Sequence, residues 1–283
     1  MLNLSKLYLK FRRRLLSYVA RLYCLVWPNK NYTFSLPDGS RFDYPLNSVI
    51  GRALFTGGFE IIEVEFMRQS LKPGNVLFDI GANGGLFTII AAKQVGSSGH
   101  VYAFEPGLQE LKLLRHNIAI NNLTNVTVIE AAVSNKKGTT QFAISHDGAM
   151  NSLAQTNHPS QKIESWQTVE MTTIDNVIEE LSIPQVNFIK IDVEGAEKLV
   201  IEGAKNILSS DKNPIILFEA SDLNAISFGY SAQELISEIQ SAQFSVNYLN
   251  EAGLLTPISN FDSRLGKEIY NFIALKQPVL VKH

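Results

Sequence analysis

Segment 79–85 has the residue types of a small-ligand loop: it begins with Asp79 and continues with glycines and an asparagine. Gly81 and Gly85 permit a tight turn and a close approach of a ligand to the backbone. A helix that begins after the turn would also offer free N–H donors. The dinucleotide motif G-x-G-x-x-G begun at Gly81 fails, because asparagine and leucine stand at two of its glycine positions. A loop that starts with Asp79 suits a cationic or zwitterionic ligand better than pyrophosphate.

A second acidic residue, Glu105, ends the next apolar run. A carboxylate at the end of such a strand can accept hydrogen bonds from both hydroxyls of a ribose. Glycine turns alone indicate little, since any tight strand-to-helix turn uses them. Together with Glu105 they indicate an adenosyl ligand. The candidate binding residues from these two segments are Asp79, Gly81, Asn83, Gly85 and Glu105.

A third acidic segment, KIDVEGAE at positions 190–197, ends another apolar run and precedes a helical pattern. Asp192 and Glu194 would then project near the carboxyl edge of a sheet. The residues alone leave two interpretations open. The carboxylates complement the N-terminus of the helix that follows, or they act on a bound ligand.

Apolar runs and helical patterns alternate after residue 75, which predicts an α/β fold with a mostly parallel sheet and helices on both faces. The predicted strands are 76–80, 101–104, 126–129, 186–191, 214–218, 244–249 and 269–275, the last two as a closing antiparallel pair. Helices are expected at 59–71, 86–95, 109–121, up to residue 208 after the fourth strand, and after the capping-box sequence 231–234. In such sheets ligands bind beyond the carboxyl ends of the strands, where the three acidic segments lie.

Residues 134–170 interrupt this alternation with a polar stretch. A strand pair, 139–144 and 168–171, is expected to bracket a polar loop, and long ordered loops in α/β domains are often functional. Because histidine titrates near neutral pH, His146 is the first candidate of this loop for proton transfer. The alternative is a solvent-exposed histidine without a role.

The first 50 residues are predicted to be an extension of a domain that covers residues 51–283. Segments 32–36 and 41–44 flank a Pro-Asp-Gly turn and predict a hairpin. Apolar residues within 2–27 recur on one face of a helix: Leu4, Leu7, Phe11, Leu15, Tyr18, Leu22 and Leu25. No apolar run here approaches the ~20 residues that span a bilayer, and no signal peptide is predicted. The helix is expected either to lie on an anionic membrane surface or to pack on the domain or on a second subunit.

Charge is unevenly divided along the chain. Residues 1–37 contain seven basic and no acidic residues, whereas the rest contains 18 basic and 27 acidic residues. An acidic body argues against nucleic acid as the main partner. The single cysteine, Cys24, excludes an intramolecular disulfide and a multi-cysteine zinc site. We expect a cytoplasmic protein whose N-terminal helix is its candidate for peripheral membrane contact.

The sequence resembles the FkbM family of S-adenosylmethionine-dependent methyltransferases. The resemblance covers about residues 56–220 and rests on DIGANGGLFT (79–88), VYAFEP (101–106), HNIAINN (116–122), EAAVSNKKGT (130–139), TTIDNVI (172–178), KIDVEGAE (190–197) and ILFEA (216–220). It implies a Rossmann-like, doubly wound sheet of seven strands that ends in an antiparallel hairpin. It also implies methyl transfer, commonly to a hydroxyl of a sugar or a polyketide.

The resemblance implies a role for individual residues. Asp79, Gly81, Asn83 and Gly85 would hold the methionine part of the cofactor, Glu105 the ribose, and Glu130, Ala131 and Ala132 the adenine. Asp192 would lie closest to the sulfonium and the acceptor. Glu60 belongs to an upstream segment that would cover the cofactor.

A sulfonium methyl is reactive, so the protein mainly has to align it, but a sugar hydroxyl is a weak nucleophile and a base helps. The candidates for that base are Asp192, Glu194 and His146. No metal is predicted, because the spacing does not require one. The alternative is a divalent cation on Asp192, Glu194 and Glu219, since hard cations take oxygen ligands.

The expected function is O-methylation of a hydroxyl in a glycan or in its activated or lipid-linked precursor. Methyl transfer to a polyketide or another small molecule is one alternative. A non-catalytic scaffold with a methyltransferase-like fold, associated with a membrane, is the other.

Overall fold

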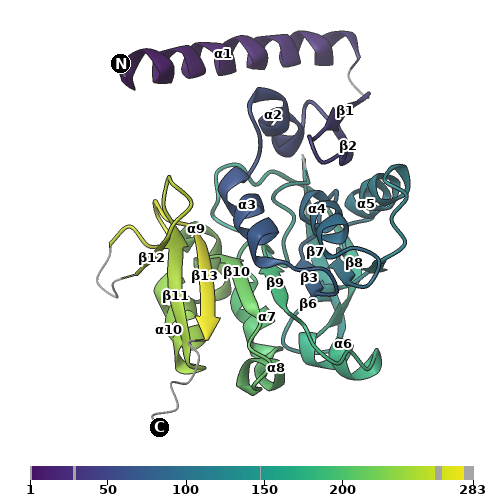
Figure 1. Ribbon diagram of the computed structural model, residues 1–283, viewed down its shortest axis with the longest axis vertical. Coiled ribbons are helices and arrows are strands. Elements are labelled where there is room, and N and C mark those ends of the chain that lie inside the picture. The colour runs from purple at the N-terminus through teal and green to yellow at the C-terminus, as the bar shows by residue number, and fades with distance from the viewer. Residues whose placement is uncertain (1, 28–29, 147, 259–262, 277–283) are drawn as a thin grey trace.

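The computed structural model describes residues 2–27, 30–146, 148–258 and 263–276, and in the first helix it describes side chains at residue 12 and from residue 14 onward. A central sheet carries helices on both faces (Figure 1). A long N-terminal helix, α1 (Leu2–Val26), lies apart from the sheet, on the side to which the parallel strands point.

The central sheet contains all seven predicted strands and one more. The five parallel strands are β3 (Val76–Ile80), β4 (His100–Phe104), β5 (Val126–Ile129), β9 (Phe188–Ile191) and β10 (Ile215–Glu219). The antiparallel strands are β11 (Phe244–Leu249), β12 (Leu255–Pro257) and β13 (Asn271–Lys276). The order across the sheet is β12-β11-β13-β10-β9-β3-β4-β5. The predicted Rossmann-like α/β fold is confirmed, and β12 was not predicted because three residues carry no periodic pattern.

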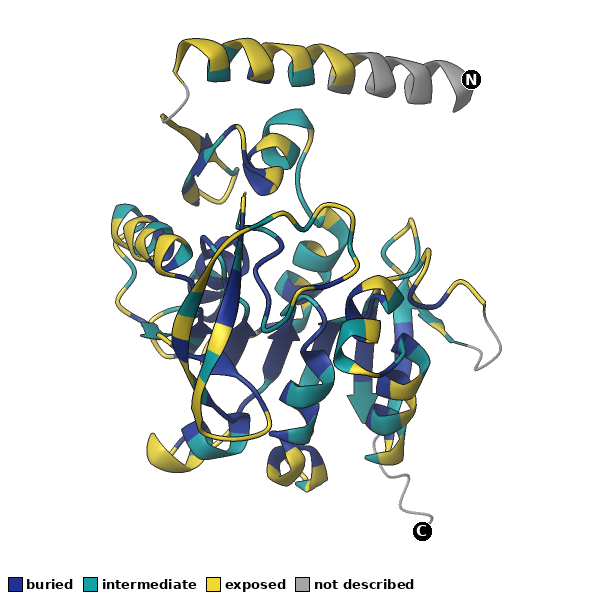
Figure 2. Cartoon of the chain, turned by 180° about the vertical axis from the view of Figure 1, so that it is seen from behind, coloured by how far each residue is buried: buried dark blue, intermediate teal, exposed yellow. Residues whose placement is uncertain are grey.

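Alternate residues of each strand face opposite sides of the sheet, and each side has its own helices. In β10, Ile216 and Phe218 belong to the same core as α6 (Ile174–Glu180), α7 (Glu197–Glu202), α8 (Lys205–Ser209) and α10 (Ala232–Ser241). Leu217 belongs to the core on the other side, with α3 (Ile61–Ser70) and α4 (Leu86–Val95). The strands are buried on both faces (Figure 2), which explains why their sequences are almost continuously apolar.

The helix expected up to residue 208 is in fact two short helices, because α7 ends at Glu202 and α8 begins at Lys205. Gly203 lies between them, and a Cβ at this position would be 2.1 Å from the backbone oxygen of Ser134. Glycine at position 203 therefore lets the backbone at Ser134 pack directly against the break between the two helices.

A second sheet is built from the polar stretch. β6 (Ala132–Val133) and β7 (Gly138–Ser145) flank β8 (Ile163–Thr172). The predicted strand pair is confirmed, although β8 begins five residues earlier than expected. The loop between β7 and β8 returns to the carboxyl edge of the main sheet.

The predicted N-terminal hairpin is also present, as β1 (Asn31–Ser35) and β2 (Arg41–Pro45). Asn117 in α5 (Leu108–Ile120) ties it to the domain: its Oδ1 accepts the N–H of Asp43 at 2.8 Å, and its Nδ2 donates to the oxygen of Gly84 at 2.8 Å. The boundary predicted after residue 50 falls inside α2 (Val49–Thr56), and the hairpin shares its core with α4. Among the described residues, no helix is both long and apolar enough to cross a membrane.

Candidate active site

A cavity of about 420 Å³ lies at the carboxyl ends of the parallel strands, where the acidic segments were expected to meet. The turns after β3, β4, β5 and β9 and the end of β10 line it, together with α2, the residues before α3 and the loop between β7 and β8. Most of the predicted site residues contribute to its lining: Glu60, Gly81, Asn83, Glu105, Ala131, Ala132, Asp192 and Glu194.

Gly81 is the point at which the turns after β3 and β9 touch. Its φ is +80°, and a Cβ there would lie 1.8 Å from the carbonyl oxygen of Asp192. Its N–H donates to the carbonyl oxygen of Phe104 at 3.1 Å, so the end of β4 also contacts this turn. Glycine is therefore required both by the backbone conformation and by the contact between the turns.

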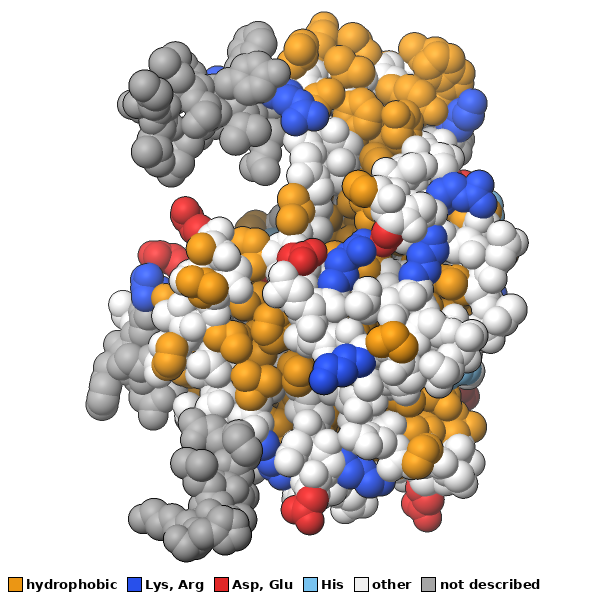
Figure 3. Space-filling view, in the orientation of Figure 1, with side chains coloured by type: hydrophobic (Ala, Val, Ile, Leu, Met, Phe, Trp, Pro, Cys, Tyr) orange, Lys and Arg blue, Asp and Glu red, His pale blue; other side chains and the backbone are white. Residues whose placement is uncertain are grey.

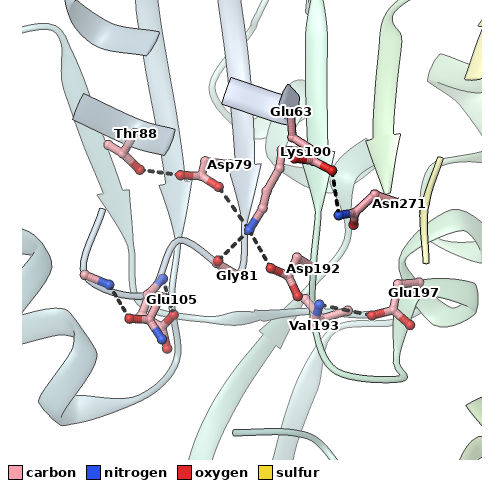
Figure 4. A network of polar contacts seen from close by, with 12 residues as sticks. Glu63, Asp79, Gly81, Thr88, Glu105, Lys190, Asp192, Val193, Glu197 and Asn271 are labelled. Carbon is pink, nitrogen blue, oxygen red and sulfur yellow. Dashed lines mark hydrogen bonds and ion pairs between the residues drawn. The ribbon is translucent and has the colours of Figure 1, made fainter. Parts of the chain in front are cut away.

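Glu105 is held by backbone donors at one end of the cavity (Figure 4). Its Oε2 accepts the N–H of Asn83 and its Oε1 accepts the N–H of Gly107, both at 2.8 Å. Burial and the charge of Glu110 raise the pKa of Glu105 to about 8, although the two N–H donors favour the ionised form. The carboxyl is thus fixed in place and able to accept further hydrogen bonds from ligand hydroxyls.

Lys190 is a buried lysine at the centre of the site (Figure 4). Its Nζ lies 3.0 Å from the carbonyl oxygen of Gly81, 3.2 Å from Asp192 Oδ2 and 3.8 Å from Asp79 Oδ1. Burial alone would lower the pKa of Lys190, but the charges of Asp192, Asp79 and Glu60 raise it above its usual value. We did not predict this role. The signal available in the sequence was a lysine inside an otherwise apolar strand, β9.

Asp79 and Gly85, which were expected to contact the methionine part of a cofactor, are not among the residues that line the cavity. Asp79 is fully buried and accepts a hydrogen bond from the hydroxyl of Thr88. Burial raises its pKa, while Lys190 and Thr88 oppose that rise. Gly85 has a φ of +91° before α4, and a Cβ there would lie 2.6 Å from Leu114. Asp79 therefore anchors Lys190 and α4, and Gly85 makes room for α5.

Glu130 and His146 also lie outside the cavity lining. Glu130 is half exposed and forms an ion pair with Arg115. The His146 side chain is 73% exposed and pairs with Glu164, and it is not among the residues that line the cavity. His158, from the same loop, does line the cavity. The loop that the sequence singled out thus reaches the cavity through His158, while His146 lies outside the lining.

An acidic cluster occupies the cavity beside Lys190. Asp192, Glu194 and Glu219 each place one carboxylate oxygen within 4.8 Å of the others, as the metal alternative supposed. Burial raises the pKa of Glu194 and of Glu219 well above the usual value, and the neighbouring carboxylates raise both further. Burial and the charge of Asp192 raise the pKa of Glu60 to about 8. Glu60 can therefore be protonated near neutral pH, and the ionised carboxylates of the cluster offer oxygen ligands to a cation.

Three lining residues share a left-handed backbone conformation that residues other than glycine adopt less often. Their φ angles are +46° for Glu60, +49° for Asn83 and +54° for Glu194. Such strain persists where the surrounding structure determines the conformation, and it gathers at functional sites. Glu194 is fixed by Ser152, which donates to its carbonyl oxygen at 2.7 Å, and by Asn224, which donates to its carboxylate at 2.7 Å.

Another part of the cavity lining is apolar and includes Ala131, Ala132, Phe142, Met150 and Leu153. Asn151 also lines the cavity, and its buried Nδ2 has no hydrogen-bond partner within the described residues. A flat aromatic ligand with acceptor atoms would fill such a wall and satisfy that donor.

A family model described as the methyltransferase FkbM domain matches residues 79–246. The chain belongs to the FkbM methyltransferase family. Its described residues 79–146 and 148–246 accordingly form an S-adenosylmethionine-dependent methyltransferase domain, as the resemblance implied.

Three curated relatives illustrate the range of the family. The 31-O-demethyl-FK506 methyltransferase FkbM of Streptomyces tacrolimicus is 28% identical over 167 residues, covering 48% of this chain and 62% of that protein. The hexuronic acid methyltransferase AglP of Haloferax volcanii is 25% identical, over a match that covers 52% of this chain and 57% of that protein. The 2-O-methyltransferase NoeI of Sinorhizobium fredii is 29% identical, over a match that covers 53% of this chain and 65% of that protein. The chain thus spans less than two thirds of each of these relatives.

The residues in the cavity fit S-adenosylmethionine. Glu105 suits the ribose hydroxyls, and the unpartnered Nδ2 of Asn151 lies in the lining with the apolar residues that suit the adenine. Asp192 and Glu194 would face a positively charged sulfur. The turn at Gly81 leaves no room for a side chain, so the backbone itself forms this part of the wall.

Proposed function

We propose that this chain transfers the methyl group of S-adenosylmethionine to a hydroxyl of a sugar, in a glycan or in a glycan precursor. The observation that carries the proposal is the gathering of Asp192, Glu194 and Glu219 in a cavity that also fits an adenosyl group. Sugar hydroxyls both donate and accept hydrogen bonds. A protonated carboxyl group both donates and accepts hydrogen bonds and an ionised one accepts them, and burial raises the pKa of Glu194 and of Glu219.

When bound, S-adenosylmethionine supplies a methyl group on a positively charged sulfur. Glu105 would accept hydrogen bonds from the ribose and so help to position the cofactor. Asp192 would hold the acceptor hydroxyl and take its proton as the hydroxyl oxygen receives the methyl group. Lys190 donates to Asp192 throughout, which keeps that carboxylate oriented.

The relatives support oxygen as the accepting atom and a sugar as its carrier, because one is named for hexuronic acid and another for 2-O-methyl transfer. A non-sugar hydroxyl is the second candidate. The relative named for 31-O-demethyl-FK506 favours it, and so do the apolar side chains of Val49, Ile50 and Phe59 in the cavity lining.

The test is turnover of S-adenosylmethionine by the purified chain with a panel of neutral sugars, uronic acids and polyketide alcohols, measured as S-adenosylhomocysteine formed. We expect turnover with a sugar, and we expect Asp192→Asn to lower kcat about 10²–10⁴-fold, the range for loss of a positioned base. The cofactor Kd of this variant should change much less than its kcat.

Glu130→Gln is the matched control, since it neutralises a carboxylate outside the cavity and should leave kcat and Kd unchanged. Turnover with polyketide alcohols alone would replace the sugar by the second candidate. Tight cofactor binding without turnover on any acceptor would contradict the proposal and favour a scaffold.

A further inference from the structure

The exposed side of α1 carries a continuous apolar surface, which we call the α1 apolar surface: Leu15, Tyr18, Val19, Leu22, Leu25 and Val26. At 100° per residue these positions fall within an arc of about 120°. They are 43% to 79% exposed, with Leu25 the most exposed. Four of them, Leu15, Tyr18, Leu22 and Leu25, belong to the face predicted to be apolar from the sequence, and these four are exposed.

The opposite side of α1 is the one that packs on the protein. Ala20 is buried, and Tyr23 and Cys24 join the core beneath it. The rings of Tyr23 and Tyr32 lie 6.1 Å apart, and Tyr32 lies 5.3 Å from Phe55 of α2. The helix is therefore anchored through one side, and the apolar side is left available to a partner.

Basic residues border the apolar arc on both edges. Arg14 and Arg21 fall at one edge by helical geometry and Arg12 at the other, and all three are exposed. Figure 3 shows hydrophobic side chains gathered over this end of the molecule with lysine and arginine beside them. This is the charge distribution that suits an anionic lipid surface, where apolar side chains enter the headgroup layer and basic ones meet phosphates. A second copy of α1 is a poor match, because residues 1–37 contain no acidic residue to offset its basic charge.

The position of α1 relates this surface to the cavity. α1 rests on α2, and Val49 and Ile50 of α2 line the cavity. The carboxyl ends of the parallel strands point to the same side of the domain as α1 (Figure 1). A bilayer bound by α1 would therefore lie on the cavity-bearing side.

We propose that α1 binds an anionic lipid bilayer through the α1 apolar surface and its basic borders, and that it holds the cavity next to acceptors carried in that bilayer. The second half of this statement rests on the proposed function. The first half does not, because lipid binding needs neither cofactor nor turnover.

The test is cosedimentation of the full chain with vesicles of equimolar phosphatidylglycerol and phosphatidylcholine. We expect binding that salt weakens and that pure phosphatidylcholine vesicles do not support. Leu22→Glu/Leu25→Glu should weaken partitioning by about tenfold or more, since two apolar side chains no longer enter the bilayer. Arg14→Glu/Arg21→Glu should weaken it by about tenfold as well.

Matched controls change equally exposed residues elsewhere on the molecule. Leu181→Glu/Leu254→Glu and Lys72→Glu/Lys212→Glu should leave vesicle binding unchanged. Failure of the wild-type chain to bind anionic vesicles would overturn the proposal, and so would equal losses in the controls. A dimer in solution that Leu22→Glu/Leu25→Glu dissociates would assign the surface to a second copy instead. Cofactor binding by every variant, measured in parallel, shows that the domain is folded and keeps this result separate from the proposed function.

Discussion

The two ends of the cavity hold negative charge in different ways. At the end that holds Glu105, which we call the adenosyl end after its proposed ligand, the Glu105 carboxyl accepts hydrogen bonds from two backbone N–H groups in turns that glycines shape. At the other end, carboxyl groups from the residue before α3, from β3, from the turn after β9 and from the end of β10 lie near the buried Lys190. The first end is fixed by the backbone and the second by a balance of side-chain charges.

This difference indicates which end tolerates change. Backbone donors remain when a side chain is replaced, so the adenosyl end should lose affinity without losing structure. The acidic end depends on Lys190 for its neutrality, so removal of one side chain should disturb several groups together.

The largest expected effect is that of Lys190→Met, which leaves Asp79 and Asp192 without their shared cation. We expect the free energy of unfolding to fall by about 3–5 kcal/mol, as for other broken buried ion pairs. Urea denaturation measures it. Adding Asp79→Asn to this variant should restore part of the loss, because it removes the carboxylate that is left buried.

Lys198→Met is the control, since its Nζ lies 3.9 Å from Glu238 in a partly exposed pair. It should cost less than about 1 kcal/mol. Equal losses in the two variants would remove the distinction between the ends.

An intermediate effect is expected from pH at the adenosyl end. The pKa of Glu105 is raised to about 8, so at neutral pH the carboxyl of the free protein is mostly protonated. Ribose hydroxyls favour its ionised form, so cofactor binding should release a proton and tighten as pH rises toward 8, by at most about tenfold per unit. Titration calorimetry in buffers of different ionisation enthalpy measures the released proton.

The raised pKa of Glu105 affects folding stability in the opposite direction: stability falls as the pH rises, whereas cofactor binding tightens. The protonated Glu105 contributes fully below its ordinary pKa of 4.5, and that contribution is lost as the pH rises through about 8. Glu105→Gln should abolish both the proton release and the pH slope of cofactor binding. Glu60→Gln, whose carboxyl has a similar pKa at the other end, should retain them. The reverse result would place the linked proton at the acidic end.

The smallest expected effect is that of His146→Ala. Because its imidazole is exposed and paired with Glu164, we expect less than about a twofold change in kcat or in cofactor Kd. His158→Ala should instead raise the KM of the acceptor, since His158 lines the cavity. Steady-state kinetics on one acceptor compares the two, and a larger loss in His146→Ala would restore that histidine as a candidate base.

The parts of the fold that repeat a simple pattern were predictable from sequence. The strands from Val76 to Lys276 are runs of apolar residues because both faces of the sheet are covered, and the acidic residues at their ends marked the cavity. The break at Gly203 and the strand β12 were missed, because each depends on a tertiary contact or on pairing and not on local periodicity.

The candidate site was predictable as a set of segments but not as a set of contacts. Asp79 and Glu105 look alike in sequence, each ending a strand, yet Asp79 turns inward to Lys190 and Glu105 turns to the cavity. Side-chain direction at a strand end depends on how the next turn leaves, and sequence does not show that. The left-handed conformation of Glu60 and Glu194 has no local signature either, because glutamate does not favour it.

The contact between Gly81 and the carbonyl of Asp192 has a thermodynamic consequence. The turn after β3, proposed to receive the cofactor, and the turn after β9, proposed to receive the acceptor, are in direct contact, and Lys190 binds both. A ligand that binds at one turn and orders both turns lowers the entropic cost of binding a second ligand at the other turn. By linkage the effect is mutual: S-adenosylhomocysteine and the acceptor should each strengthen the binding of the other by the same factor. If the association rate of S-adenosylhomocysteine does not change, the acceptor should slow its release by that factor.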